Sequence, residues 1–431
     1  MSTPKKPTST AQPPEPPVLV IPKAWLVTLA VLIVMPWLIA GAVYWWLNAQ
    51  STAPPPDATR TPKEAAAKAG PWGRLDVTTV TISPPMELVG NEWGRSADQG
   101  KYWFFPNTAP EAAAASLASA GLDQGAVAAL MATARRESGI NGIVITPGAE
   151  LVRGLPPEVR AKLYVQLAGS ALNSDQVHAF RYAAESVEAW FGRSLISPET
   201  RRFIEPLIYR HGGHLYFADV ELARLQIADP EELRRLAKTL LRQKTSRVRL
   251  SVPSRVEVPG LVEYWGRGGR RTDIRPLLES IAAEESDGSD GSIDIVHLLP
   301  AFARERLYRY PLLTAADLNR PALANCLWTA LNFFSLVPDE RYLDVQASVD
   351  HLQRDYYLVE NGLELGDVTV LIDERGVIYH AVVHLADNLV FTKNGTSPMA
   401  PWVILPLDVV VDYYRLRSEN PRMLHHRRKD R

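Results

Sequence analysis

The feature that most constrains this chain is an apolar run without a charged side chain, residues 24–47. An α-helix rises about 1.5 Å per residue, so about 20 apolar residues cross the hydrocarbon core of a bilayer. Trp25 stands at one end of the run and Trp45 and Trp46 at the other, where indole rings favour the membrane–water interface. The sequence therefore predicts a single transmembrane helix.

A cleaved signal peptide is the competing interpretation, because small residues follow the run. The apolar core of a signal peptide is normally about 7–15 residues, which favours the membrane anchor. Lys5, Lys6 and Lys23 precede the run, whereas Arg60 and Lys63 follow it at a distance. Since positively charged residues stay on the cytoplasmic side, we expect a single-pass protein of the cell membrane with its N-terminus inside and its C-terminal body outside.

The rest of the chain divides by composition. Residues 1–23 are rich in proline and are expected to form a disordered tail, and residues 48–74 a flexible linker. Residues 75–310 carry apolar residues at three- and four-residue spacing behind capping residues, which predicts a mostly helical module of unknown role. Residues 311–431 read as a separate domain with a short basic tail.

Composition excludes several classes of function. The chain of 431 residues has one cysteine, Cys326, and nine histidines, which excludes a zinc-finger site and an intrachain disulfide. The formal net charge is -1 and no basic field points to nucleic acid. His211 and His214 lie three apart on a Gly-Gly turn without a third ligand nearby, so turn histidines are the better interpretation. We expect no metal and no cofactor; protein partners and oligomeric state stay open.

Cys326 lies in the segment "ANCLWTALNFF", where apolar residues at Leu327, Ala330, Leu331 and Phe334 form one stripe of a helix. The cysteine is therefore expected near a helix N-terminus. Unpaired backbone N–H groups there favour an anion, so we expect a lowered thiol pKa and a nucleophile. A buried structural cysteine is the alternative, because free cysteines are among the most buried residues.

A catalytic thiol needs an imidazole to take its proton and a third polar group to hold the imidazole. Downstream, "LGDVTVLIDERGVIYHAVVHLADNLVFTKNG" reads as three antiparallel strands. His380 and His384 lie four apart on the second strand and share a face. In the third strand, alternation puts Thr392 and Asn394 on one face and Lys393 on the other. Asn394 has the better acceptor for an imidazole N–H, but it also belongs to an Asn-Gly turn signal.

Residues 315–415 resemble the NlpC/P60 superfamily of cysteine peptidases. The matching motifs are an Asn-Cys pair at Cys326 that opens a helix, a Gly-Asp pair at Asp367 before an apolar strand, and His380 followed by alternating apolar residues. The chain departs from the family pattern at Leu327, where the family often has serine or glycine after the cysteine. The resemblance covers roughly a quarter of the chain.

The resemblance implies an α+β, papain-like domain in which the Cys-bearing helix packs on an antiparallel sheet. It further implies that Cys326 attacks an amide carbonyl, that His380 rather than His384 is the base, and that Asn394 or Thr392 is the third residue. The implied substrate is a peptide of cell-wall peptidoglycan, which agrees with an outward topology. The alternatives are an amidase or acyltransferase acting on lipid or protein, and a catalytically degenerate domain that binds or assembles in the envelope.

Overall fold

The computed structural model describes residues 69–89, 102–137, 139, 141–252, 254–283, 291–311, 322–395, 397, 399–418 and 420–429. The predicted tail, the predicted membrane span and most of the predicted linker lie outside these residues. No helix within the described ranges is long and apolar enough to cross a membrane. The chain from Glu64 onward forms one compact unit of mixed α and β structure with antiparallel sheets.

A six-stranded antiparallel sheet dominates the C-terminal part, with the strand order β13-β12-β11-β10-β14-β9. Its strands are β9 Tyr356–Leu358, β10 Val368–Ile372, β11 Ile378–Ala386, β12 Leu389–Lys393, β13 Trp402–Pro406 and β14 Arg422–Arg428. The three-stranded meander expected from the sequence is confirmed as β10, β11 and β12. Gly376 closes the first turn with φ 83° and Asp387 the second with φ 52°, two left-handed positions that tight turns require.

Helices cover both faces of this sheet. They are α15 Cys326–Leu331, α16 Val345–Asp355, α17 Leu407–Tyr413 and the 3-10 turn η5 Glu340–Leu343. Alternation along β11 assigns the two faces: Ala381 and Val383 pack in the same core as Trp328 of α15, whereas Val382 packs with Val410 of α17. The fold therefore places the Cys-bearing helix against β11 and β12.

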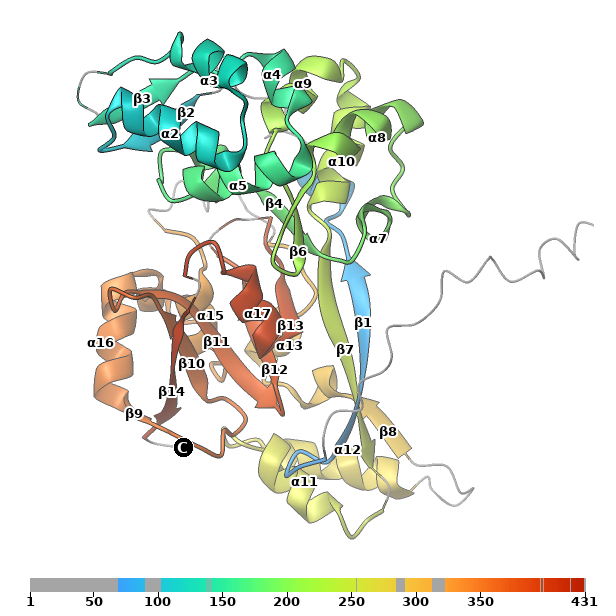
Figure 1. Cartoon of the computed structure of the whole chain (residues 1–431). Coiled ribbons are helices and arrows are strands. Elements are labelled where there is room, and N and C mark those ends of the chain that lie inside the picture. The colour runs from blue at the N-terminus through green and yellow to red at the C-terminus, as the bar shows by residue number, and fades with distance from the viewer. Residues whose placement is uncertain are drawn as a thin grey trace, which may run out of the picture. The chain divides into compact units, whose positions relative to one another are not determined.

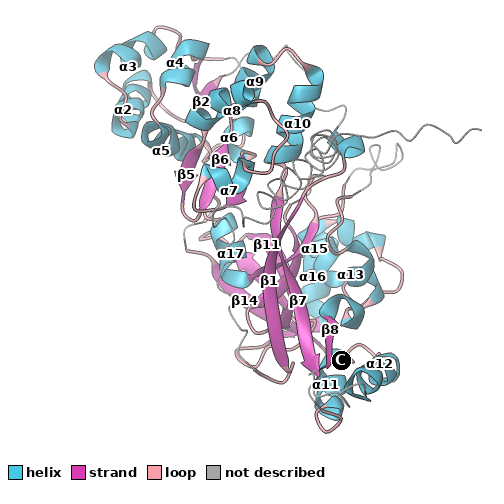
Figure 2. Cartoon of the chain, turned by 90° about the vertical axis from the view of Figure 1, so that its right-hand side faces the viewer, coloured by secondary structure: helices cyan, strands magenta, loops and turns pink. Residues whose placement is uncertain are grey.

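Two long strands join the C-terminal sheet to the N-terminal part of the compact unit. β1 Arg74–Ile82 pairs along its whole length with β7 Gln243–Val252, and β8 Gly291–Asp294 extends this sheet (Figure 1). The helices α11 Val258–Trp265, α12 Arg271–Ala283 and α13 Ala301–Arg306 and the turn η4 Ile295–Leu298 belong to the same region, with α11 and α12 beside β8 (Figure 2). Thr245 Oγ1 in β7 donates to the Ile404 carbonyl and accepts from the Ile404 N–H, both at 3.0 Å. One hydrophobic core is shared by this region and the C-terminal sheet, so it crosses the domain boundary predicted at residue 310.

A second hydrophobic core lies between Trp103 and Leu240. Its helices are α2 Pro110–Ala120, α3 Gln124–Met131, α4 Ala149–Gly154, α5 Pro157–Leu167, α6 Ser174–Val177, α7 Val187–Phe191, α8 Pro198–Ile204, α9 Val220–Gln226 and α10 Pro230–Leu240, with η1 Met86–Val89 and η2 Glu205–Leu207 nearby. This part of the chain is mostly helical. It also holds two small antiparallel sheets, from β2 Trp103–Pro106 and β3 Gly142–Ile145, and from β4 Phe180–Ala183, β6 His214–Phe217 and β5 Tyr209–His211. We call residues 102–241 the helical module.

A buried ion pair anchors the helical module. Arg160 and Asp219 have no exposed side-chain surface, and the guanidinium donates to the carboxylate. Tyr164 donates its hydroxyl to Asp219 at 2.7 Å, and Arg160 donates to the Val152 carbonyl at 2.7 Å. Each charge is therefore paired and hydrogen-bonded, as burial requires.

Replacing Arg160 by Met should destabilise the protein strongly, because Asp219 would stay buried without its cation. We expect a loss of about 3–5 kcal/mol in the free energy of unfolding, measured by urea denaturation. Arg153→Met is the matched control, because Arg153 pairs at 3.1 Å with Glu150 while their side chains are 46% and 87% exposed. Its expected cost is below about 1 kcal/mol. Equal effects of the two substitutions would show that the buried pair does not anchor the module.

Candidate functional site

The Asn-Cys motif is a helix start. Asn325 has extended backbone angles and its side chain accepts the Trp328 backbone N–H at 2.8 Å, which makes it the N-cap of α15. Cys326 is the first residue of the helix, so its expected place at a helix N-terminus is confirmed. Trp328 is a buried core side chain, as is Trp402, whose indole N–H donates to Thr329 Oγ1 at 3.0 Å.

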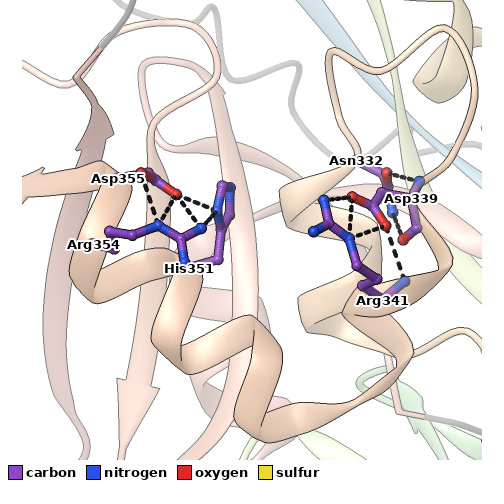
Figure 3. A network of polar contacts seen from close by, with 6 residues as sticks. All are labelled: Asn332, Asp339, Arg341, His351, Arg354 and Asp355. Atoms are coloured by element: carbon purple, nitrogen blue, oxygen red, sulfur yellow. Dashed lines mark hydrogen bonds and ion pairs between the residues drawn. The ribbon is translucent and has the colours of Figure 1, made fainter.

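Polar contacts fix the C-terminal end of α15 as well (Figure 3). Asn332 donates to the Trp328 carbonyl at 3.0 Å and accepts the Asp339 backbone N–H at 2.6 Å, which ties the following loop to the helix. Together with the Asn325 cap, these contacts hold the Cys-bearing helix at both ends. Figure 3 also shows a separate pair on α16, where His351 Nδ1 lies 2.6 Å from a carboxylate oxygen of Asp355.

The Gly-Asp motif has a structural role: Gly366 packs against Phe334, and Asp367 forms an ion pair with Arg427. Gly366 has φ 93°, and a Cβ there would lie 2.0 Å from the Phe334 ring, so only glycine fits. Asp367 pairs with Arg427 at 2.7 Å, and its carbonyl accepts the His384 N–H at 2.8 Å. The His384 ring therefore shares the surroundings of Asp367 and Arg427, and burial lowers its pKa to about 4.

Cys326 contacts β11 beyond the point where the pairing between β11 and β12 ends, and we call this point the fork. The β11–β12 ladder pairs Val383 with Phe391 and continues toward the turn, so Ala381 lies outside that pairing. The Ala381 backbone N–H instead interacts with the thiol, as do the N–H groups of Cys326 and Leu327 at the helix start. Cys326 keeps part of its surface exposed, yet desolvation around the sulfur raises the thiol pKa against these donors that lower it. The net direction is opposite to the lowered pKa expected from the sequence, because desolvation outweighs the helix N-terminus.

Lys393 is the charged neighbour of this thiol. Its side chain is 1% exposed, and Nζ donates to the carbonyls of Gly395 at 2.9 Å and Ser397 at 2.8 Å. Burial lowers the Lys393 pKa to about 7, while the charge interaction with Cys326 raises it. The same interaction lowers the thiol pKa, so Lys393 favours the thiolate.

His380 has one engaged and one free ring nitrogen. Nε2 lies 3.0 Å from Thr392 Oγ1, and Thr392 donates its hydroxyl to the Ala381 carbonyl at 3.4 Å. In the tautomer with the proton on Nε2, Oγ1 accepts from Nε2–H and Nδ1 carries a lone pair. Nδ1 is buried without a hydrogen-bond partner among the described residues. Burial lowers the His380 pKa to about 3, so the imidazole is neutral.

The structure brings the predicted residues together in part. Cys326 contacts the peptide unit next to His380, yet no hydrogen bond joins the thiol and the imidazole among the described side chains. The contact to the imidazole that we expected from Asn394 is made by Thr392 instead. β12 ends at Lys393, so Asn394 lies past the strand in a turn with Gly395 at φ 83°, and side-chain alternation no longer applies to it. The Asn394 Oδ1 atom is buried without a partner among the described residues.

Lys393 and Tyr414 belong to the site but were not predicted as functional residues from the sequence. Lys393 was expected on the opposite face from Thr392, and that placement holds, but its burial beside the thiol was not foreseen. Tyr414 follows α17 and its ring lies 4.2 Å from the His380 ring, centroid to centroid. Its only sequence signal is a Tyr-Tyr pair after an apolar stretch, which is also typical of ordinary core.

A cleft of about 730 Å³ opens beside the site. Tyr379, Asn394 and Tyr414 line it from the C-terminal part, and Arg181 and Leu240 from the helical module. A cleft of this size is within the range of small-ligand sites, about 300–1,000 Å³.

Comparisons with protein-family models, with curated proteins and with solved structures find no match for this chain.

Alkylation of Cys326 should report its raised pKa directly, because it is the only cysteine in the chain. We expect slow reaction with iodoacetamide at pH 7 and a rate that rises about tenfold per pH unit to beyond pH 8.5, since the thiolate is the nucleophile. Lys393→Met should slow the reaction at and below about pH 7, where the Lys393 ammonium is charged, and should have little effect well above that pH, where the amine is neutral. Mass spectrometry of the intact chain measures both rates.

Lys244→Met is the matched control, because Lys244 is a partly buried lysine whose charge partner is Glu185. This variant should react at the parent rate. Rapid labelling of the parent at pH 7 would contradict the dominance of burial at the thiol.

Proposed function

We propose that the protein is a cysteine hydrolase that cleaves an amide bond, with peptides of cell-wall peptidoglycan as its substrate class. The observation that carries the proposal is Cys326 at a helix start, in contact with the Ala381 N–H next to a neutral His380, whose Nδ1 has no partner among the described residues and whose Nε2 contacts Thr392. The substrate class comes from the resemblance to NlpC/P60 peptidases and from the membrane anchor expected at residues 24–47. Digestion of intact cells with an added protease would show whether the body lies outside.

The proposed reaction begins with attack of the Cys326 sulfur on the amide carbonyl. Because burial raises the thiol pKa and lowers the imidazole pKa to about 3, a preformed thiolate–imidazolium pair is unfavourable relative to the neutral pair. The proton therefore passes to His380 as the sulfur attacks, and His380 then delivers it to the leaving amine. Lys393 favours the negative charge that develops on the way. Water hydrolyses the resulting thioester.

Cys326→Ser and His380→Ala should each lower the release of peptides from purified peptidoglycan by at least about a hundredfold. Without the thiol no thioester forms, and without the imidazole nothing accepts its proton. His384→Ala is the control, because His384 faces Asp367 and Arg427 rather than the thiol, and it should keep most of the activity. Chromatography of the released peptides measures the rate. If His384→Ala is inactive while His380→Ala works, the base has been assigned to the wrong histidine.

Thr392→Val should lower turnover by at least about tenfold with little change in KM, because the Nε2–H of His380 loses its acceptor and the tautomer is no longer fixed. Asn394→Ala should lower the thermal midpoint more than the rate, since Asn394 lies in the turn after β12. Steady-state kinetics and thermal unfolding of both variants separate the two roles. A normal rate in Thr392→Val would remove the hydroxyl from the reaction.

A second candidate is a catalytically degenerate domain that binds a peptide in the envelope. The raised thiol pKa and the lack of a thiol–imidazole hydrogen bond within the described part of the chain favour it. The peptide-release assay distinguishes the two. Unchanged low release in Cys326→Ser, with binding to peptidoglycan retained in a pull-down, would establish the binding module.

A further inference from the structure

The charged side chains among the residues that line the cleft beside the candidate site are all positive. Its lining residues include Arg181 and Arg417, and none of them is an aspartate or glutamate. Arg181 lies on β4 of the helical module, whereas Arg417 follows α17 in the C-terminal part. The cleft therefore offers positive charge from two segments far apart in the sequence.

Arg181 is a cation without a carboxylate partner among the described residues. Its Nη1 donates to the Tyr413 carbonyl at 2.6 Å, and its guanidinium lies 4.3 Å from the Tyr413 ring centroid and 5.7 Å from that of Tyr216. The Nε atom is buried and has no hydrogen-bond partner within the described ranges. Since buried charges in proteins are normally paired, the Arg181 guanidinium is suited to pair with an anion.

The helical module is fastened to α17 next to this arginine. The β5–β6 turn donates the Gly213 N–H to Asp412 at 3.0 Å, and His214 Nδ1 lies 2.7 Å from the same carboxylate. A Cβ at Gly212, where φ is 58°, would lie 2.8 Å from Asp412, so the turn needs a small residue. The Gly-Gly turn between two histidines thus serves as a docking contact.

This contact fixes Arg181 relative to the candidate site. Arg181 packs on Tyr413, and the next residue, Tyr414, packs on the ring of His380. The chain of contacts from the module to the imidazole therefore passes through only two aromatic side chains. A group bound at Arg181 therefore lies next to the pair Tyr413 and Tyr414, which borders the imidazole.

We propose that the cleft binds a carboxylate of the peptide substrate at Arg181, so that the helical module selects substrates that carry a negative charge near the cleaved bond. This inference rests on the proposed function. It assigns a role to a module outside the segment that resembles the peptidase family. An arginine suits this role because its guanidinium stays charged and holds a carboxylate through two parallel hydrogen bonds.

The alternative role of Arg181 is purely structural, through its stacking on Tyr413. A cation–π contact of this kind stabilises the fold. The two roles differ in what a substitution changes: a structural role affects the thermal midpoint, whereas an anion site affects discrimination between charged and neutral ligands.

The test measures binding rather than turnover, by calorimetry on the full chain with Cys326→Ser to prevent cleavage. The probes are a synthetic peptidoglycan stem peptide with free carboxylates and the same peptide with every carboxylate converted to a carboxamide. We expect the free acid to bind at least about tenfold more tightly, which corresponds to about 1.4 kcal/mol. Adding Arg181→Met should reduce this preference to within about twofold, and Arg181→Lys, which keeps the charge without the paired geometry, should give an intermediate value.

Arg210→Met is the matched control. Arg210 lies on β5 of the same small sheet and also donates to backbone carbonyls, of Ala184 at 3.1 Å and Glu185 at 2.7 Å, but it is not among the residues that line the cleft. It should keep the full preference for the free acid. Absence of binding, absence of a preference in the parent, or an undiminished preference in Arg181→Met and Arg181→Lys would overturn the proposal.

The outcomes for the two proposals are separable. Preferential binding of the free acid without cleavage by the chain that retains Cys326 would refute the hydrolase and keep the anion site. Cleavage of both peptides with equal KM would keep the hydrolase and refute the anion site. Thermal unfolding of each variant shows whether its fold is intact.

Discussion

The site depends on the packing of a short capped helix against the fork between β11 and β12. Asn325 fixes the start of α15, so that Cys326 meets the one part of β11 where the backbone N–H of Ala381 lies outside the β11–β12 pairing. The same fork buries Lys393 beside the sulfur. Desolvation shifts the pKa of the thiol, the imidazole and the ammonium group in the direction of the neutral form of each.

Burial on this scale changes the chemistry expected of a cysteine–histidine pair. A resting thiolate is unfavourable here, so the proposed reaction needs a proton acceptor that acts during attack. Thr392 holds the imidazole for that role through the contact between its Oγ1 and Nε2, while Nδ1 has no hydrogen-bond partner among the described residues. The helical module completes the setting through Arg181 and Tyr413, which border the cleft beside the same imidazole.

Local patterns in the sequence were sufficient to predict the helix and the strands that carry the site. The Asn-Cys start of a helix, the meander that follows and the place of His380 on its second strand are all determined by residues close in the chain. Contacts between residues far apart in the chain could not be predicted from such local signals. The pairing of β1 with β7 joins residues 74–82 to residues 243–252, and no local pattern reveals such a long-range contact. The contact of Thr392 rather than Asn394 with the imidazole has a related cause: β12 ends at Lys393, so side-chain alternation does not extend to Asn394.

The central claim is that Cys326 forms a covalent bond with the substrate. Acid-quenched mass spectrometry of the full chain mixed with soluble peptidoglycan peptides tests this claim directly, because a thioester survives acid and adds the mass of the acyl fragment. The account predicts an adduct that maps to Cys326 and is absent from Cys326→Ser. Peptide release at the parent rate without an adduct, equally fast in Cys326→Ser, would contradict it.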